Sequence, residues 1–185
     1  MPTWAWIVII VAAVLLVVAV AAGIATRAAR RRSLQSRFGP EYDRTVSDAP
    51  SRREAESELR ERERRRDELE IRPLSAGDRR RYLREWERVQ ADFVDDPGTA
   101  VSEADTLIQR VMRDRGYPVE DFEQRAADLS VDHAEVLEHY RTGHAIARKH
   151  ARDEAGTEDL RQALVHYRAL FDELLTEEPA RAGQV

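Results

Sequence analysis

The sequence predicts an all-α protein with one N-terminal transmembrane helix, a charged helical stalk and an antiparallel bundle of four main helices plus one short helix. Residues 4–25 carry no charge, residues 51–70 are mostly Arg and Glu, and apolar residues after Ser75 recur at three- and four-residue steps. No segment shows the apolar–polar alternation that is typical of a strand. The chain has no Cys, which excludes disulfides and cysteine nucleophiles.

Residues 1–26 are predicted to form a transmembrane anchor. The uncharged run Trp4–Ala25 has 22 residues, twelve of them Ile, Val or Leu. At about 1.5 Å per residue, its helix spans about 33 Å, close to the hydrocarbon thickness of about 30 Å. Trp4 and Trp6 lie at one end of the run, where indole rings prefer the headgroup boundary.

Two alternatives to an anchor are a cleavable signal peptide and a buried core helix. A signal peptide requires positive charge before its apolar run and a shorter run, whereas only the α-amino group precedes this one. A core helix is less suitable because a run that is apolar on every face favours lipid. We therefore expect an uncleaved anchor.

Residues 27–50 are predicted to be a basic juxtamembrane segment followed by a linker. The basic residues are Arg27, Arg30, Arg31, Arg32 and Arg37. Because positive charge is retained on the cytoplasmic side, they favour an outside N-terminus and a cytoplasmic C-terminal domain at the cell membrane. Gly39, Pro40, Asp48 and Pro50 then indicate the linker.

Residues 51–72 are predicted to form a charged Arg/Glu stalk. Between Ser51 and Glu70 the only large apolar residues are Leu59 and Leu69, so the segment is expected to bury no face. Pairs of opposite charge four residues apart contribute about 0.2–0.5 kcal/mol each to such a helix. A coiled coil is less expected because its a and d positions would mostly carry charge.

Residues 73–178 are predicted to form a cytoplasmic helical bundle, and residues 179–185 a flexible tail. A short helix is expected over residues 118–129, and the last helix has the clearest apolar seam, from Leu160 to Leu175. The expected caps are Ser75, Asp96, Ser130 and Thr157 at helix N-termini and Gly116 at a C-terminus. Four main helices with short connections favour an antiparallel bundle.

Two of the predicted helices share the tripeptide His-Tyr-Arg, at residues 139–141 and 166–168. The spacing places the two tyrosines on facing helix faces, where buried phenols need hydrogen-bond partners. Core packing is the simpler interpretation. The alternative is a candidate pocket formed by Tyr140, His144, His166 and Tyr167.

No catalytic residue, metal site or cofactor is predicted. The chain contains no H-E-x-x-H, no G-x-S-x-G and no glycine-rich phosphate-binding motif. His133 and His144 are separated by about 16 Å along a helix, so one metal ion cannot join them. A site that joins His144 or His139 to His166 across two helices stays open as an alternative.

Five segments of the chain carry a resemblance. They are residues 70–75 (EIRPLS), 86–97 (WERVQADFVDDP), 115–118 (RGYP), 130–133 (SVDH) and 157–175 (TEDLRQALVHYRALFDELL). In these segments the chain resembles an uncharacterised family of small single-pass membrane-anchored helical proteins from high-GC Gram-positive bacteria. The resemblance implies a helical cytoplasmic domain behind an N-terminal anchor. It implies no activity, because none is assigned to that family.

The charge distribution indicates which partners to expect. Residues 27–44 carry a net charge of +4, whereas residues 75–178 carry 15 basic and 24 acidic residues, a net charge of −9. An acidic domain is repelled by nucleic acid, so we expect no nucleic-acid partner. We expect a membrane-tethered cytoplasmic interaction module, an adaptor or scaffold, whose partners are the lipid bilayer and a protein.

Two further interpretations of the function stay open. One is a sensor that binds a small ligand or a metal in the bundle core. The other is an extracytoplasmic helical domain, if the topology is reversed. An enzyme is not expected.

Overall fold

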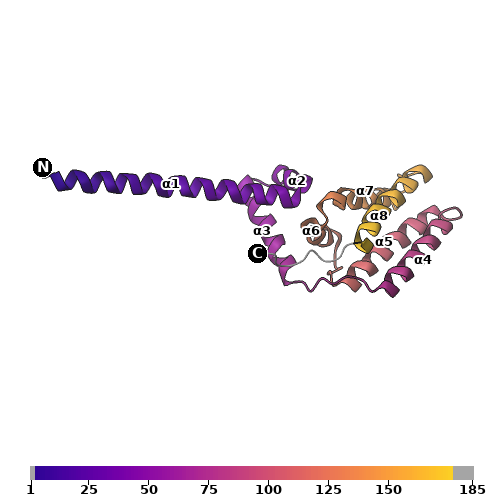
Figure 1. Cartoon of the computed structure of the whole chain (residues 1–185). Helices are drawn as coiled ribbons and strands as arrows, with labels where there is room; N and C mark the ends of the chain where they lie inside the picture. The colour runs from indigo at the N-terminus through magenta and orange to yellow at the C-terminus, as the bar shows by residue number, and fades with distance from the viewer. Residues whose placement is uncertain (1–2, 177–185) are drawn as a thin grey trace.

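The computed structural model describes the backbone of residues 3–176 and the side chains of residues 15–176. Within this part of the chain there are eight helices and no strand, so the protein is all-α (Figure 1). The helices are α1 Thr3–Phe38, α2 Pro40–Asp48, α3 Arg52–Glu68, α4 Ala76–Asp92, α5 Pro97–Arg115, α6 Phe122–Asp132, α7 Ala134–His150 and α8 Thr157–Thr176.

The bundle is built from α4, α5, α7 and α8, with the shorter α6 at one end. Within this unit α8 packs against both α7 and α5. Its core contains Trp86, whose ring stacks on Phe171 with centroids 4.6 Å apart. The apolar seam predicted on the last helix is buried at Leu160, Tyr167 and Leu174, which is why α8 lies at the centre of the domain.

The predicted caps at Ser75, Asp96 and Gly116 are confirmed. The Ser75 hydroxyl accepts the Asp78 amide at 3.0 Å, and Asp96 accepts the Thr99 amide at 3.0 Å. Gly116 ends α5 with φ +99°, a left-handed conformation that glycine adopts without a steric penalty. Each cap is a local interaction within a few residues.

The prediction that Ser130 caps a helix was wrong. Ser130 lies inside α6, and its hydroxyl donates to the Ala127 carbonyl oxygen at 2.6 Å. The chain turns at His133 instead, so α7 begins at Ala134. The cap predicted at Thr157 also differs, since Thr157 is already the first residue of α8.

A second packed unit joins the end of α1 to α2 and α3; we call residues 34–68 the arm. Leu34, Phe38, Tyr42 and Leu59 form a buried cluster with Val131 of α6. Between α1 and α2 the chain turns at Gly39, whose φ of +47° suits glycine. In Figure 1, α1 extends from this cluster as a single straight rod.

The arm corrects two predictions. The linker expected within residues 27–50 contains helix α2, with Pro40 at its first position. The prediction that the stalk over residues 51–72 buries no face was also wrong. Helix α3 buries Ala55, Leu59 and Arg62 against α2 and α6. One Leu, one Ala and the methylene groups of an Arg are enough to bury one side of this charged helix.

The transmembrane prediction is not supported by the described residues. Within that part of the chain, no helix combines the length and the apolarity that crossing a membrane requires. The side chains of Trp4 and Trp6 lie outside the described residues, as does the tail predicted over residues 179–185. The span Trp4–Ala25 stays a prediction.

Candidate functional site

The two His-Tyr-Arg tripeptides meet where α7 crosses α8. Gly143 allows the helices to approach closely, because a β-carbon there would stand 3.0 Å from two ring atoms of Tyr167. Tyr140 and Tyr167 face each other at this crossing with ring centroids 6.1 Å apart, and both side chains are fully buried. The predicted facing of the tyrosines is therefore confirmed.

The tyrosines lie in a polar part of an otherwise apolar core. The Arg125 guanidinium donates from Nε to the Tyr140 hydroxyl at 3.0 Å. Burial raises the pKa of Tyr140 and of Tyr167, and the nearby Asp105 carboxylate raises both further. Both phenols therefore stay protonated at neutral pH, which suits them to orient packing rather than to act as bases.

The two histidines of the predicted pocket lie apart from each other. His144 stacks on Phe122, with centroids 3.7 Å apart and an interplanar angle of 7°, on the side of Tyr140. Burial lowers the pKa of His144, and Asp105 and Arg125 influence it with opposite signs. His166 instead faces His139, with their Nδ1 atoms 2.8 Å apart. The structure thus groups Tyr140, Tyr167 and His144 and places His166 in a separate surface pair.

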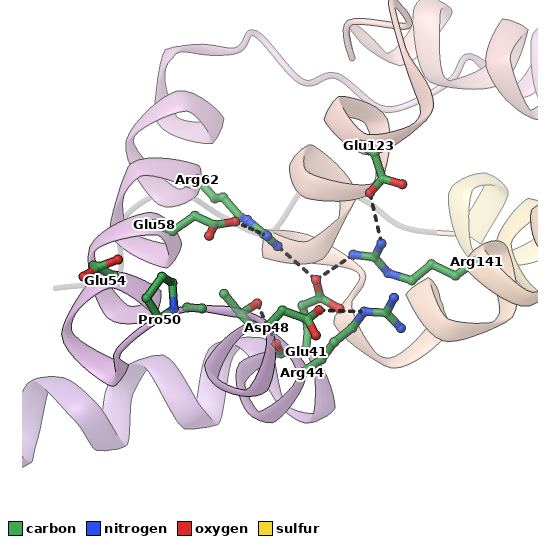
Figure 2. A pocket seen from close by; sticks show the side chains of 11 residues that line it. Glu41, Arg44, Asp48, Pro50, Glu54, Glu58, Arg62, Glu123 and Arg141 are labelled. Carbon is green, nitrogen blue, oxygen red and sulfur yellow. Dashed lines mark hydrogen bonds and ion pairs between the residues drawn. The ribbon is translucent and has the colours of Figure 1, made fainter.

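The arm joins the bundle through a buried carboxylate that the sequence analysis missed. Glu41 of α2 accepts from Arg62 of α3 at 3.0 Å and from Arg141 of α7 at 2.7 Å (Figure 2). Arg62 also donates to Ser130 of α6 at 3.3 Å. We call Glu41, Arg62, Arg141 and Ser130 the Glu41 junction.

A cavity of about 330 Å³ opens beside the Glu41 junction. Figure 2 shows Glu58 beside Arg62 and Glu123 beside Arg141 at its wall. Arg44 extends the network to Glu138 of α7 at 3.5 Å. These ion pairs join the arm to the bundle beside the apolar contact that Val131 makes with the arm. The arrangement is that of a structural joint between α1 and the bundle.

A second buried polar group lies at the C-terminal end of α6, three residues after Ser130. His133 is buried, its Nε2 lies 3.2 Å from the Tyr117 hydroxyl, and its Nδ1 lies 3.6 Å from Glu173 of α8. Burial and the Arg115 charge lower the pKa of His133 to about 4, against the opposing effect of Asp132 and Glu173. His133 is therefore neutral at pH 7.

The metal-ligating side chains of the described residues do not cluster. Between residues 15 and 176, no group of three or more His, Asp or Glu side chains is placed to hold a metal ion. The sequence left open a site that joins His166 to either His139 or His144. Of these two pairs, the structure brings together His139 and His166.

Comparison of the chain with protein-family models, with curated proteins and with solved structures finds no match. The family resemblance therefore stays a prediction.

Proposed function

We propose that the protein is a membrane-tethered cytoplasmic interaction module that binds a partner protein close to the bilayer. One observation carries the proposal: α1 continues without a break from the apolar segment to Leu34 and Phe38, which are buried in the arm. The tether and the domain therefore share one helix instead of meeting at a flexible linker.

The geometry of α1 supports a fixed position near the membrane surface. From Ala25 to Leu34 a helix rises about 14 Å, so packing of the arm begins about 14 Å beyond the apolar run. The aliphatic side chains described in that run, from Leu15 to Ile24, are exposed on all faces, which suits lipid contact. A domain held this close has a raised effective concentration for membrane partners.

The orientation follows from the arginines that surround α1 between these two points. Arg27, Arg30 and Arg32 are exposed, and Arg37 pairs with Glu63 of α3 at 3.3 Å. Positive charge beside an apolar run favours the cytoplasmic side. The bundle, with its net charge of −9 in residues 75–178, would be repelled by an anionic leaflet, and the continuous helix opposes any approach.

Membrane extraction tests the tether. The double variant Leu16→Arg, Val20→Arg costs roughly 5–7 kcal/mol of insertion free energy, and we expect it to leave the membrane fraction under alkaline carbonate. The matched control Ser33→Arg adds charge beyond the apolar run and should stay in the membrane fraction. Protease protection of residues 75–176 in intact cells tests the orientation. Digestion from outside would overturn the cytoplasmic assignment.

We further propose that the partner docks between α4 and α8. A cavity of about 320 Å³ there is lined by Phe93, Leu164 and Val165, and the Val165 side chain is 53% exposed. Arg161 and Arg168 flank it, with side chains 52% and 38% exposed, and each pairs with a carboxylate of α8, Glu158 and Asp172 respectively, at 2.6 Å. The Arg168 guanidinium lies 5.4 Å from the Trp86 ring. We call this surface the α4–α8 groove.

The composition of the α4–α8 groove indicates the partner's chemistry. Aromatic residues and Arg are enriched at the energetic centres of protein interfaces. An apolar groove of helices with basic edges on an otherwise acidic domain is complementary to an amphipathic helix with carboxylates beside its apolar face. The occupant we propose is such a helix from a partner protein.

Site-specific photo-crosslinking tests the docking surface. A photoreactive residue at Val165 should crosslink to an acidic amphipathic segment that mass spectrometry identifies, whereas one at Glu135, exposed on α7, should not. Arg161→Glu should reduce the yield at least fivefold. Arg152→Glu is the matched control, because Arg152 is equally exposed and also pairs with a neighbouring Glu. A crosslink to a second copy of this chain, or equal yields from both positions, would overturn this occupant.

A further inference from the structure

The pair His139 and His166 lies on the solvent side of the His-Tyr-Arg crossing. His139 is exposed and His166 is partly exposed, in contrast to Tyr140 and Tyr167 beside them. Their Nδ1 atoms are 2.8 Å apart, and their rings have centroids 5.1 Å apart with an interplanar angle of 36°. The two imidazoles come from different helices and face each other.

The position of the pair is fixed by the packing beneath it. Gly143 closely approaches Tyr167 and the Ala163 carbonyl oxygen. His139 lies one turn before Gly143 on α7, and His166 lies beside Tyr167 on α8. Each histidine is followed directly by a tyrosine that is fully buried in the core. The two backbones therefore cannot separate without disturbing that core, which makes the pair preorganised.

The surroundings of His166 favour the neutral imidazole that a metal ion requires. Burial lowers the pKa of His166, and the charge that His139 carries when protonated lowers it further. Glu138 lies near enough to raise the pKa of His166, so its carboxylate also attracts a cation to this surface. Arg44 of α2 pairs with Glu138 at 3.5 Å and competes for that carboxylate.

We propose that His139 and His166 form a two-imidazole site for a divalent ion with square-planar geometry, Cu²⁺ or Ni²⁺. At metal–nitrogen distances of about 2.0 Å, two nitrogens in adjacent square-planar positions are about 2.8 Å apart, the separation found here. A tetrahedral ion would require the nitrogens to be about 3.3 Å apart. The ion takes the place of the hydrogen between the two Nδ1 atoms. The ring that donates gives up its Nδ1 proton to water and takes one up at Nε2, so both imidazoles stay neutral and no net proton is released. Water occupies the remaining positions.

The test uses the full-length chain in mild detergent, titrated with Cu²⁺ alone. Calorimetry should give one tight site per chain, and electron paramagnetic resonance should show hyperfine splitting from two equivalent nitrogens. His139→Ala and His166→Ala should each weaken binding at least tenfold. Bound Cu²⁺ should also raise the melting temperature, because the ion links α7 to α8 in the folded state only.

His150→Ala is the matched control, since His150 lies on α7 away from the pair and its loss should change neither affinity nor spectrum. Both histidines of the pair lie near the surface, and circular dichroism checks that the variants fold. Unchanged Cu²⁺ affinity in the His139→Ala, His166→Ala double variant would overturn the proposal. A one-nitrogen spectrum, or the absence of a tight site in the unmodified chain, would do so equally.

Discussion

Glu41 is the residue on which the connection between the arm and the bundle most depends. Its carboxylate is almost fully buried and accepts from two guanidinium groups whose own side chains are about nine-tenths buried. A buried ion pair is close to neutral against an apolar replacement, but removal of one member leaves an uncompensated charge. Glu41 is the shared member, so its loss affects both Arg62 and Arg141.

Glu41→Gln should therefore lower the free energy of unfolding by about 3 kcal/mol. The measurement is urea denaturation of the full-length chain in mild detergent. Asp48→Asn is the matched control. Asp48 lines the same cavity but is 73% exposed and pairs with Arg44 at 3.9 Å, so its change should stay within about 0.5 kcal/mol. Equal effects of the two substitutions would contradict a buried role for Glu41.

His133 should make stability depend on pH. Its pKa is about 4 in the folded chain and about 6.5 in the unfolded chain, so the unfolded chain binds more protons between these values. The contribution of His133 is complete above about pH 6.5 and is lost as the pH falls toward 4. At about 1.4 kcal/mol per pH unit, the loss reaches up to about 3 kcal/mol.

The measurement compares urea denaturation at several pH values for the unmodified chain and His133→Gln. The variant should show a flatter decline of stability between pH 6.5 and 4, because Gln does not take up the proton. His150→Gln should keep the steeper slope of the unmodified chain. A slope unchanged in His133→Gln would exclude His133 as its source.

At the scale of elements, the α7–α8 contact depends on the missing side chain of Gly143. Gly143→Ala gains up to about 1 kcal/mol of helix propensity, but its β-carbon would approach the buried Tyr167 ring to 3.0 Å. Overpacking of this kind costs about 1–3 kcal/mol, so we expect a net loss of about 1 kcal/mol in thermal unfolding experiments. Gly77→Ala, which meets only the Ser75 hydroxyl at 3.6 Å, should stabilise α4 by about 0.5 kcal/mol. Stabilisation by both substitutions would show that the crossing is loosely packed.

The elements that the sequence predicted correctly depend on local chemistry. Ser75, Asp96 and Gly116 satisfy backbone groups within three or four residues, so each can be identified without knowing the fold. The facing of Tyr140 and Tyr167 was also predictable, because both helices carry the same tripeptide at equivalent seam positions. Helical periodicity alone thus determines most of the bundle.

The arm was not predictable because its stabilising partners are distant in sequence. Arg62 bonds to Glu41 and Ser130, which lie 21 and 68 residues away. Among the many arginines of α3, nothing in the sequence distinguishes the buried Arg62 from its exposed neighbours. Ser130 was misassigned for the same reason, since its position depends on where α6 ends against the arm. The pairing of His139 with His166 was only one of the alternatives left open, because it depends on how α7 crosses α8.

At the scale of the whole molecule, the packing of the arm limits how far the bundle can move relative to α1. A solvated stalk would let the bundle move independently of α1. A packed arm instead connects α1 to α6 through apolar contacts and to α7 through the Glu41 junction. Any motion of the bundle relative to α1 therefore requires the arm to open.

Trypsin sensitivity distinguishes a packed arm from a free stalk. Residues 52–66 contain seven arginines, so a marginal solvated helix there would be cut rapidly. We expect slow cleavage in the full-length chain, because Leu59 is fully buried and proteolysis has to wait for local opening. Leu59→Ala removes about 2 kcal/mol or more of packing free energy, which corresponds to at least a thirtyfold faster cut in α3. Leu83→Ala, at a position 38% exposed on α4, should leave the rate unchanged. Rapid cleavage of α3 in the unmodified chain at the rate found in Leu59→Ala would mean that the arm is open in solution, and the rigid connection between α1 and the bundle would then have to be given up.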